Sequence, residues 1–145
     1  MGHRMRTGRR GEELAAEMLE GKGWTVLARC WRDGPREVDL VAVRSDTLLF
    51  VEVKTRRGGS LGDALAAVTP AKRREVERAA AGWLRTEGVR IRDSHPFRRV
   101  RFDVVAVLLL PGAEPCIAWV EGAWVRGDRE AGRGARRDDR RGSVR

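Results

Sequence analysis

Residues 37–54 read EVDLVAVRSDTLLFVEVK, and this stretch decides the fold. Two apolar runs, Val38 to Val43 and Leu48 to Val53, lie on either side of a polar connection at 44–47. Apolar runs of this length, separated by a short polar turn, are typical of two antiparallel strands joined as a hairpin. The sequence therefore predicts a β-hairpin at the centre of the domain.

The register of this hairpin brings charged residues together. A two- or four-residue connection centred between positions 45 and 46 pairs residues whose numbers sum to 91. Asp39 is then opposite Glu52, and Glu37 is opposite Lys54. Both pairs lie on one face of the hairpin, because side chains two residues apart on a strand share a face.

Two opposed carboxylates are unfavourable on a sheet, and about 4 Å apart they repel by roughly 4 kcal/mol at an effective dielectric of 20. A divalent cation such as Mg²⁺ bridged by Asp39 and Glu52 would compensate, and Lys54 would then hold a water nucleophile or stabilise charge on a phosphate. The alternative is an exposed hairpin face, with a Glu37–Lys54 ion pair and hydrated Asp39 and Glu52.

A helix is predicted from Glu12 to Glu20, ending at Gly21 and Gly23, because apolar residues recur at helical spacing. On a helical wheel Glu12 falls on the apolar face, whereas the other acids of this helix cluster on the opposite side. Glu12 is therefore a candidate site residue, and the alternative is a first-turn glutamate favoured by the helix dipole.

A second helix is predicted to begin at Pro70, with Thr69 as its N-cap, and to continue to Gly88. Lys72 is in line with the apolar residues of this helix, whereas the neighbouring arginines are not. We expect one base to point inward, and the alternative is a lysine that extends past the helix end to solvent.

Three further apolar stretches predict strands at Trp24 to Trp31, Arg101 to Leu110 and Cys116 to Val120. The predicted order is one helix, three strands, one helix and two strands. This order predicts a single mixed α/β domain over residues 1–125, since 145 residues suit one domain.

The charge balance favours an anionic partner. The chain has 30 Lys and Arg against 21 Asp and Glu, which gives a net charge of +9. Residues 126–145 hold eight arginines and four acids with almost no apolar residues, so a disordered basic tail is predicted there. Arg56, Arg57, Arg98 and Arg99 are candidate contacts to nucleic-acid phosphates.

Other classes are less compatible with the sequence. The longest apolar run, Val104 to Leu110, has seven residues, too few to span a membrane, and the first ten residues lack the apolar stretch of a signal peptide. A cytoplasmic location is expected. Cys30 and Cys116, with two distant histidines, show no zinc-binding spacing, and no disulfide is expected.

Several segments together resemble the YraN family of bacterial proteins, which is predicted to be endonuclease-like. They are GRRGE at 8–12, EVDLV at 37–41, FVEVKTR at 50–56, Lys72, and RFDVV at 101–105. The family is related to archaeal Holliday junction resolvases of the PD-(D/E)xK superfamily. The resemblance covers residues 8–124, and its central motif is loose alone but specific in combination.

The resemblance implies a restriction-endonuclease-like core, a mixed sheet flanked by helices. It implies metal ligation by Asp39, Glu52, the Val53 carbonyl and Glu12, catalysis by Lys54, and a basic position at Lys72. Glu37 would support the site or pair with Lys54. Family members commonly carry Asn in this segment, where the chain has Cys30, and this departure concerns a polar contact rather than the metal site.

The expected function is a Mg²⁺- or Mn²⁺-dependent DNA endonuclease that acts on branched or damaged DNA, with a homodimer suggested by the related resolvases. One alternative is a non-catalytic nucleic-acid-binding protein on the same fold. Another is a scaffold for protein partners, with Trp119 and Trp124 in an exposed apolar patch. Family membership alone does not establish activity.

Overall fold

The computed structural model describes residues 2–126, with side chains from residue 7 onward. The predicted tail, apart from Arg126, lies outside the described residues. Helices and strands follow in the order α1 (Gly2–Gly21), β1 (Thr25–Asp33), β2 (Arg36–Arg44), β3 (Thr47–Arg56), α2 (Leu61–Ala66), α3 (Pro70–Trp83), a π-helical turn (Leu84–Gly88), α4 (Val89–Ile91), β4 (Arg99–Leu108) and β5 (Cys116–Trp124). None of these helices has the length and apolar character needed to cross a bilayer.

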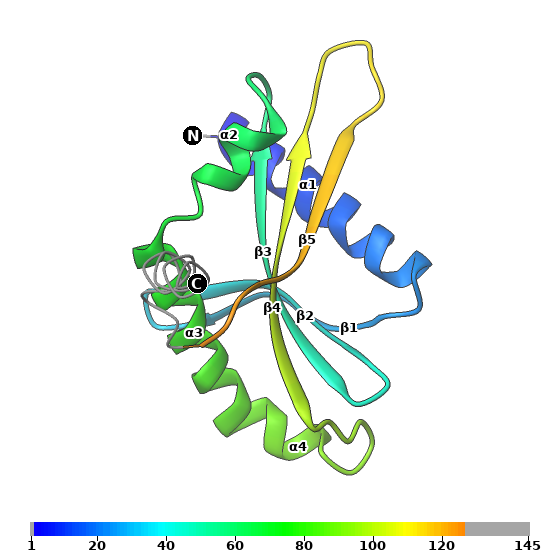
Figure 1. Cartoon of the computed structure of the whole chain (residues 1–145), viewed down its shortest axis with the longest axis vertical. Helices are drawn as coiled ribbons and strands as arrows, with labels where there is room; N and C mark the ends of the chain where they lie inside the picture. Colours follow the sequence, from blue (N-terminus) through cyan, green and yellow to red (C-terminus); the bar gives the residue numbers. More distant parts are fainter. Residues whose placement is uncertain (1, 127–145) are drawn as a thin grey trace, which may run out of the picture.

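The strands form one mixed sheet in the order β1-β2-β3-β4-β5, in which only the β3–β4 pair is parallel. Helix α1 covers one face, and α3 lies on the other (Figure 1). The predicted fold class, a mixed sheet flanked by helices as in restriction-endonuclease-like cores, is confirmed.

Alternation of side chains along the strands divides the core into two layers. Between the sheet and α1 lie residues such as Leu19, Leu40 and Val51, all fully buried. Between the sheet and α3 lie Phe50 and Trp83, whose rings meet edge to face at 5.8 Å. Each strand of the central hairpin therefore contributes to both layers, which explains its nearly unbroken apolar runs.

The hairpin register is the predicted one. Pairs run from Arg44 opposite Thr47 to Leu40 opposite Val51, and every pair sums to 91. Ser45 has a φ of 53°, a left-handed conformation that the tight two-residue turn requires. Pairing between β2 and β3 stops at Leu40 and Val51, and beyond them the β1–β2 hairpin bends away from β3 (Figure 1). We call this divergence after Leu40 and Val51 the fork.

The predicted helices are present, and two differences have local causes. Helix α1 begins at Gly2 rather than Glu12, since Gly8 and Gly11 obscured its first turns in the sequence. Gly11 is needed there because a Cβ atom would overlap the Thr55 hydroxyl of β3. The short helix α2 was not predicted, although Ser60 and Asp63 form a capping box at its start.

Helix α3 has the predicted start. Thr69 Oγ1 accepts a 3.2 Å hydrogen bond from the backbone N–H of Lys72, and Pro70 occupies the first helical position. The regular helix ends at Trp83, and the π-helical turn continues it to Gly88. This helix carries Lys72 to the sheet face that holds Phe50.

The contacts of Asp103, from the RFDVV segment, indicate a structural role. It is fully buried and accepts four hydrogen bonds of 2.7–2.9 Å, two from Arg101, one from the Trp119 indole and one from the Gly122 backbone. These bonds fasten β4 to β5 at an irregularity in their pairing. Trp124 is buried and stacks on Phe102 at 5.1 Å, so it is a core residue.

Candidate functional site

The fork exposes a backbone donor that the hairpin no longer pairs. The last paired residues are Leu40 and Val51. Asp39 and Glu52 are the next residues beyond this pair, on β2 and β3, and the predicted register places them opposite each other. Asp39 Oδ2 accepts a 2.7 Å hydrogen bond from the backbone N–H of Val53. The Asp39 side chain thus replaces a strand-to-strand contact, and this bond fixes its direction.

Glu52 lies below the protein surface. Only 5% of it is exposed, and its Oε2 atom has no hydrogen-bond partner among the described residues. Lys72 Nζ lies 3.7 Å from the other oxygen, Oε1. The alternative of a hydrated hairpin face is therefore wrong for Glu52, and the predicted inward orientation of Lys72 is confirmed.

The electrostatics of the pair disfavour two negative charges. Burial, and after it the charge of Glu52, raises the pKa of Asp39 to about 8, although the Val53 N–H opposes this shift. Burial also raises the pKa of Glu52, and the charge of Lys72 offsets part of the effect. An uncompensated buried carboxylate takes up a proton or requires a cation.

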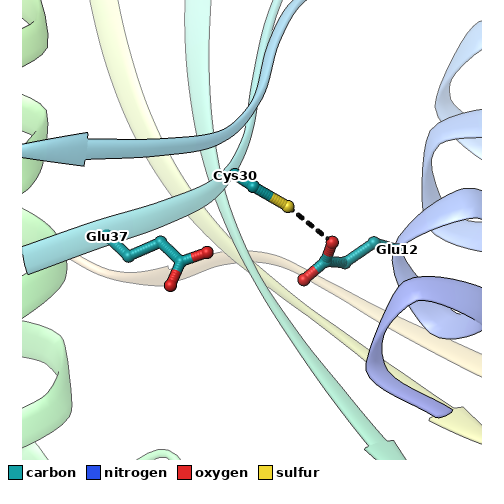
Figure 2. Close-up of side chains that lie close together, drawn as sticks. All are labelled: Glu12, Cys30 and Glu37. Atoms are coloured by element: carbon teal, nitrogen blue, oxygen red, sulfur yellow. Dashed lines mark hydrogen bonds between the residues drawn. The ribbon is translucent and has the colours of Figure 1, made fainter. Parts of the chain in front are cut away.

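Glu12 enters the fork from α1. Its Oε2 accepts a 2.7 Å hydrogen bond from Cys30 Sγ of β1, and Glu37 of β2 faces the same space (Figure 2). One ligand atom from each of these three residues lies within 4.8 Å of the other two. Partial burial, the bond to Glu12 and the charges of Glu12, Glu37 and Asp39 raise the pKa of the Cys30 thiol to about 12.

The sequence did not predict the place of Cys30 in this group. Its φ is 48°, and it is the residue skipped between Arg29, paired with Leu40, and Trp31, paired with Val38. Cys30 therefore lies opposite Asp39. The spacing of residues along the chain does not show that Cys30 lies near other metal-binding side chains, because the neighbouring carboxylates come from α1 and β2. Glu37 forms its ion pair with Arg32, at 3.4 Å, instead of the considered one with Lys54.

A cleft of about 510 Å³ opens beside the fork. It lies between the first turns of α1 and the end of β3, and its lining residues are Thr7, Gly8, Glu12, Val53, Lys54, Thr55, Arg56 and Arg57. Lys54 also acts on the buried acid, since its charge lowers the pKa of Glu52 against the effect of burial. The cleft thus joins an acidic end at Glu12 to a basic end at Arg56.

The four arginines predicted to contact phosphates do not form one surface. Arg56 and Arg57 lie in the cleft, where Arg57 Nε donates a 2.8 Å hydrogen bond to Thr7 Oγ1. Arg98 and Arg99 both donate backbone N–H groups to the Asp46 carbonyl, at the other end of the sheet. Arg99 pairs with Thr47, seven residues before Lys54, which corresponds to about 23 Å along β3.

Comparisons with known proteins place the chain among its relatives. Residues 11–107 match the model of the uncharacterised protein family UPF0102. A UPF0102 protein of Rhodococcus jostii is 43% identical over 124 residues, which cover 86% of this chain and all of the relative. One of Acidothermus cellulolyticus is 45% identical over 122 residues, 81% of this chain and 92% of the relative. The matched segment includes Glu12, the fork and Lys72, and the chain therefore belongs to the UPF0102 family, also called YraN.

Proposed function

We propose that this protein is a metal-dependent endonuclease that hydrolyses phosphodiester bonds in DNA. The observation that carries this proposal is the state of Glu52, a buried carboxylate with one unpartnered oxygen. It interacts with Asp39, whose pKa is raised to about 8, and with the charges of two lysines, Lys54 and Lys72. Burying these acids together lowers the stability of the fold, and residues with strongly shifted pKa values cluster at functional sites.

The available donors suit a hard divalent cation. Asp39, Glu52 and Glu12 offer carboxylate oxygens, and Val53, whose carbonyl would be a further ligand, lines the cleft together with Glu12. Oxygen donors of this kind favour Mg²⁺ or Mn²⁺. When bound, the cation would lower the pKa of a water molecule and neutralise charge on the phosphate. The unpartnered Oε2 of Glu52 is the atom that most needs such a partner.

The residues of the chain itself would divide the remaining work. The Val53 N–H holds Asp39 in a fixed direction, and the Lys72 ammonium holds Glu52. Lys54, in the cleft, would orient the attacking water or stabilise negative charge on the reacting phosphate. Arg56 and Arg57 would bind neighbouring phosphates of the same strand, which the net charge of +9 attracts to the protein.

Branched or damaged DNA belongs to the proposal as the substrate class that the resemblance implies. The test compares nicking of a supercoiled plasmid and of a four-way DNA junction in Mg²⁺ and in EDTA. Wild type should cut only with the metal, and Asp39→Ala and Lys54→Met should lower the rate at least about 100-fold. Glu17→Ala, which removes an exposed acid from the outer side of α1, is the matched control and should cut at the wild-type rate.

A second measurement separates the non-catalytic alternative. DNA binding by the same variants, measured by fluorescence anisotropy, should persist in Asp39→Ala because the arginines remain. Cleavage at equal rates in wild type and Asp39→Ala would refute the assignment of the site. Salt-dependent DNA binding by wild type with no cleavage in either metal would instead support a binding module on this fold.

A further inference from the structure

We propose that Glu12, Cys30 and Glu37 form a second cation site, which contains sulfur and prefers Zn²⁺ or Cd²⁺ to Mg²⁺. The site lies on the α1 side of the fork, where it shares Glu12 with the proposed magnesium site and adds Cys30 and Glu37, which the magnesium site does not use. This inference does not require the protein to cut DNA.

The geometry brings three separate elements to one point. Glu12 comes from α1, Cys30 from β1 and Glu37 from β2, and their side chains converge in the space between these elements (Figure 2). Their ligand atoms lie within 4.8 Å of one another. Ligands about 2.0–2.3 Å from a tetrahedral Zn²⁺ are about 3.5 Å apart, so small rotations of the two glutamate side chains would complete the site.

The donor set decides which cation binds. A thiolate and two carboxylates form a three-ligand site with a fourth position open to water, an arrangement that Zn²⁺ accepts. Mg²⁺ prefers an octahedron of oxygens and gains little from sulfur. When the metal–sulfur bond forms, the proton that Cys30 Sγ donates to Glu12 Oε2 is released to solvent.

The electrostatic surroundings of the three ligands favour a bound cation. Glu52, which is 5% exposed and has an unpartnered Oε2, interacts electrostatically with Glu37. Asp39 interacts with Glu12, Glu37 and Cys30 in the same way. The carboxylates around the thiol therefore form a continuous negative field that extends into the buried part of the fork, where a bound cation would be stabilised.

The contacts that compete with the metal are weak. Glu37 pairs with Arg32, but the Arg32 side chain is 71% exposed, so this ion pair contributes little and one glutamate oxygen remains for a ligand. Lys54 and Lys72 act on Glu52. The Cys30 thiol is exposed and forms no disulfide, and it can therefore be reached by a metal ion.

The test titrates Cd²⁺ alone into the full-length reduced protein and records the ultraviolet charge-transfer absorption of a cadmium–thiolate bond. Wild type should show this absorption at one equivalent, and Cys30→Ser should lose it. Cys116→Ser, which removes the other exposed free cysteine, should keep it. Loss of the absorption in Cys116→Ser but not in Cys30→Ser would overturn the proposal, as would its absence from wild type.

Affinity for Zn²⁺ alone, measured by calorimetry, tests the two carboxylates. Partners outside the first ligand shell are worth about 10- to 100-fold in metal affinity, so Glu37→Gln, which removes a direct ligand, should weaken binding at least about tenfold. Cys30→Asn should weaken it as much, and Asn tolerates a positive φ, so this variant removes sulfur without straining the backbone. Unchanged Zn²⁺ affinity in either variant would contradict the site.

Parallel measurements keep this proposal separate from the nuclease. Asp39→Ala should retain the cadmium–thiolate absorption, because Asp39 is not a ligand in the sulfur site. If Asp39→Ala cuts DNA as wild type does but keeps the absorption, the nuclease proposal fails and the sulfur site stands. If wild type cuts DNA in Mg²⁺ but shows no absorption with Cd²⁺, the sulfur site fails and the nuclease proposal stands.

Discussion

The backbone N–H of Val53 donates a 2.7 Å hydrogen bond to Oδ2 of Asp39 where strands β2 and β3 separate. This hydrogen bond explains how an ionisable residue, Asp39, can lie directly beyond the buried, paired part of the hairpin. The sheet loses one strand-to-strand contact, and the donor left over is satisfied by a carboxylate that then faces the other acids of the fork.

A first prediction concerns the cost of this arrangement as a function of pH. The pKa of Asp39 rises from 3.8 in the unfolded chain to about 8 in the fold. The stability that the protonated Asp39 side chain contributes is therefore fully present below about pH 4 and is lost as the pH rises toward 8. Asp39→Asn has no such charge. Without metal it should become more stable than wild type by at most about 1.4 kcal/mol per pH unit between pH 5 and pH 8. Urea unfolding at several pH values measures the difference, and a constant difference would contradict it.

A second prediction concerns the contact between α1 and β3. Gly11→Ala should destabilise the protein by about 1–3 kcal/mol, because the new Cβ atom overlaps the side chain of Thr55. Gly8→Ala is the matched control, since a Cβ atom there meets nothing within 4 Å. It should be neutral or stabilising by up to about 1 kcal/mol. Thermal unfolding of both variants decides, and equal shifts would show that α1 does not approach β3 as described.

A third prediction separates structure from chemistry in the RFDVV segment. Asp103→Asn should cost about 3 kcal/mol of stability, because the fully buried carboxylate accepts four hydrogen bonds and balances Arg101. Asp93→Asn, at an exposed position, should cost less than about 0.5 kcal/mol. Denaturant titration gives both values. If Asp103→Asn retained full stability and lost only DNA cleavage, its role would be chemical rather than structural.

A fourth prediction distinguishes the two arginine pairs. Replacing Arg56 and Arg57 by Ala should weaken DNA binding and reduce the logarithmic salt slope by about two phosphate contacts. Replacing Arg98 and Arg99 removes the same charge at the other end of β3, about 30 Å from Arg56 along the strand. Only the first double variant should also slow cleavage, because Arg56 and Arg57 line the cleft whereas Arg98 and Arg99 do not. Equal losses of cleavage in both double variants would contradict the assignment of the cleft.

The sequence predicted much of the fold because local rules and global packing agree in the central hairpin. Its register follows from the symmetry of two apolar runs around residues 45 and 46, and Thr69 with Pro70 marks the start of α3. The first turns of α1 were missed because Gly11 serves the contact with Thr55 rather than helix propensity. Helix α2 has six residues, too few to show a periodic pattern.

The candidate site was predictable in its acids and bases but not in its three-dimensional connections. The inward directions of Glu12 and Lys72 follow from the helical wheel, and the structure agrees. The burial of Glu52 and the approach of Cys30 to Glu12 depend on how β1 and β2 bend away from β3. That bend is a tertiary effect, and no spacing along the chain encodes it.

The most direct test of the account is whether Mg²⁺ stabilises the fold through Glu52. Thermal unfolding is recorded in EDTA and in increasing Mg²⁺ for wild type and for Glu52→Gln, a variant that keeps the shape of the side chain and removes its charge. We predict that saturating Mg²⁺ stabilises wild type, by about 2.7 kcal/mol at 100 times its dissociation constant, and leaves Glu52→Gln unchanged. Equal stabilisation of both proteins, or of neither, would contradict the claim that the buried acids of the fork hold a cation.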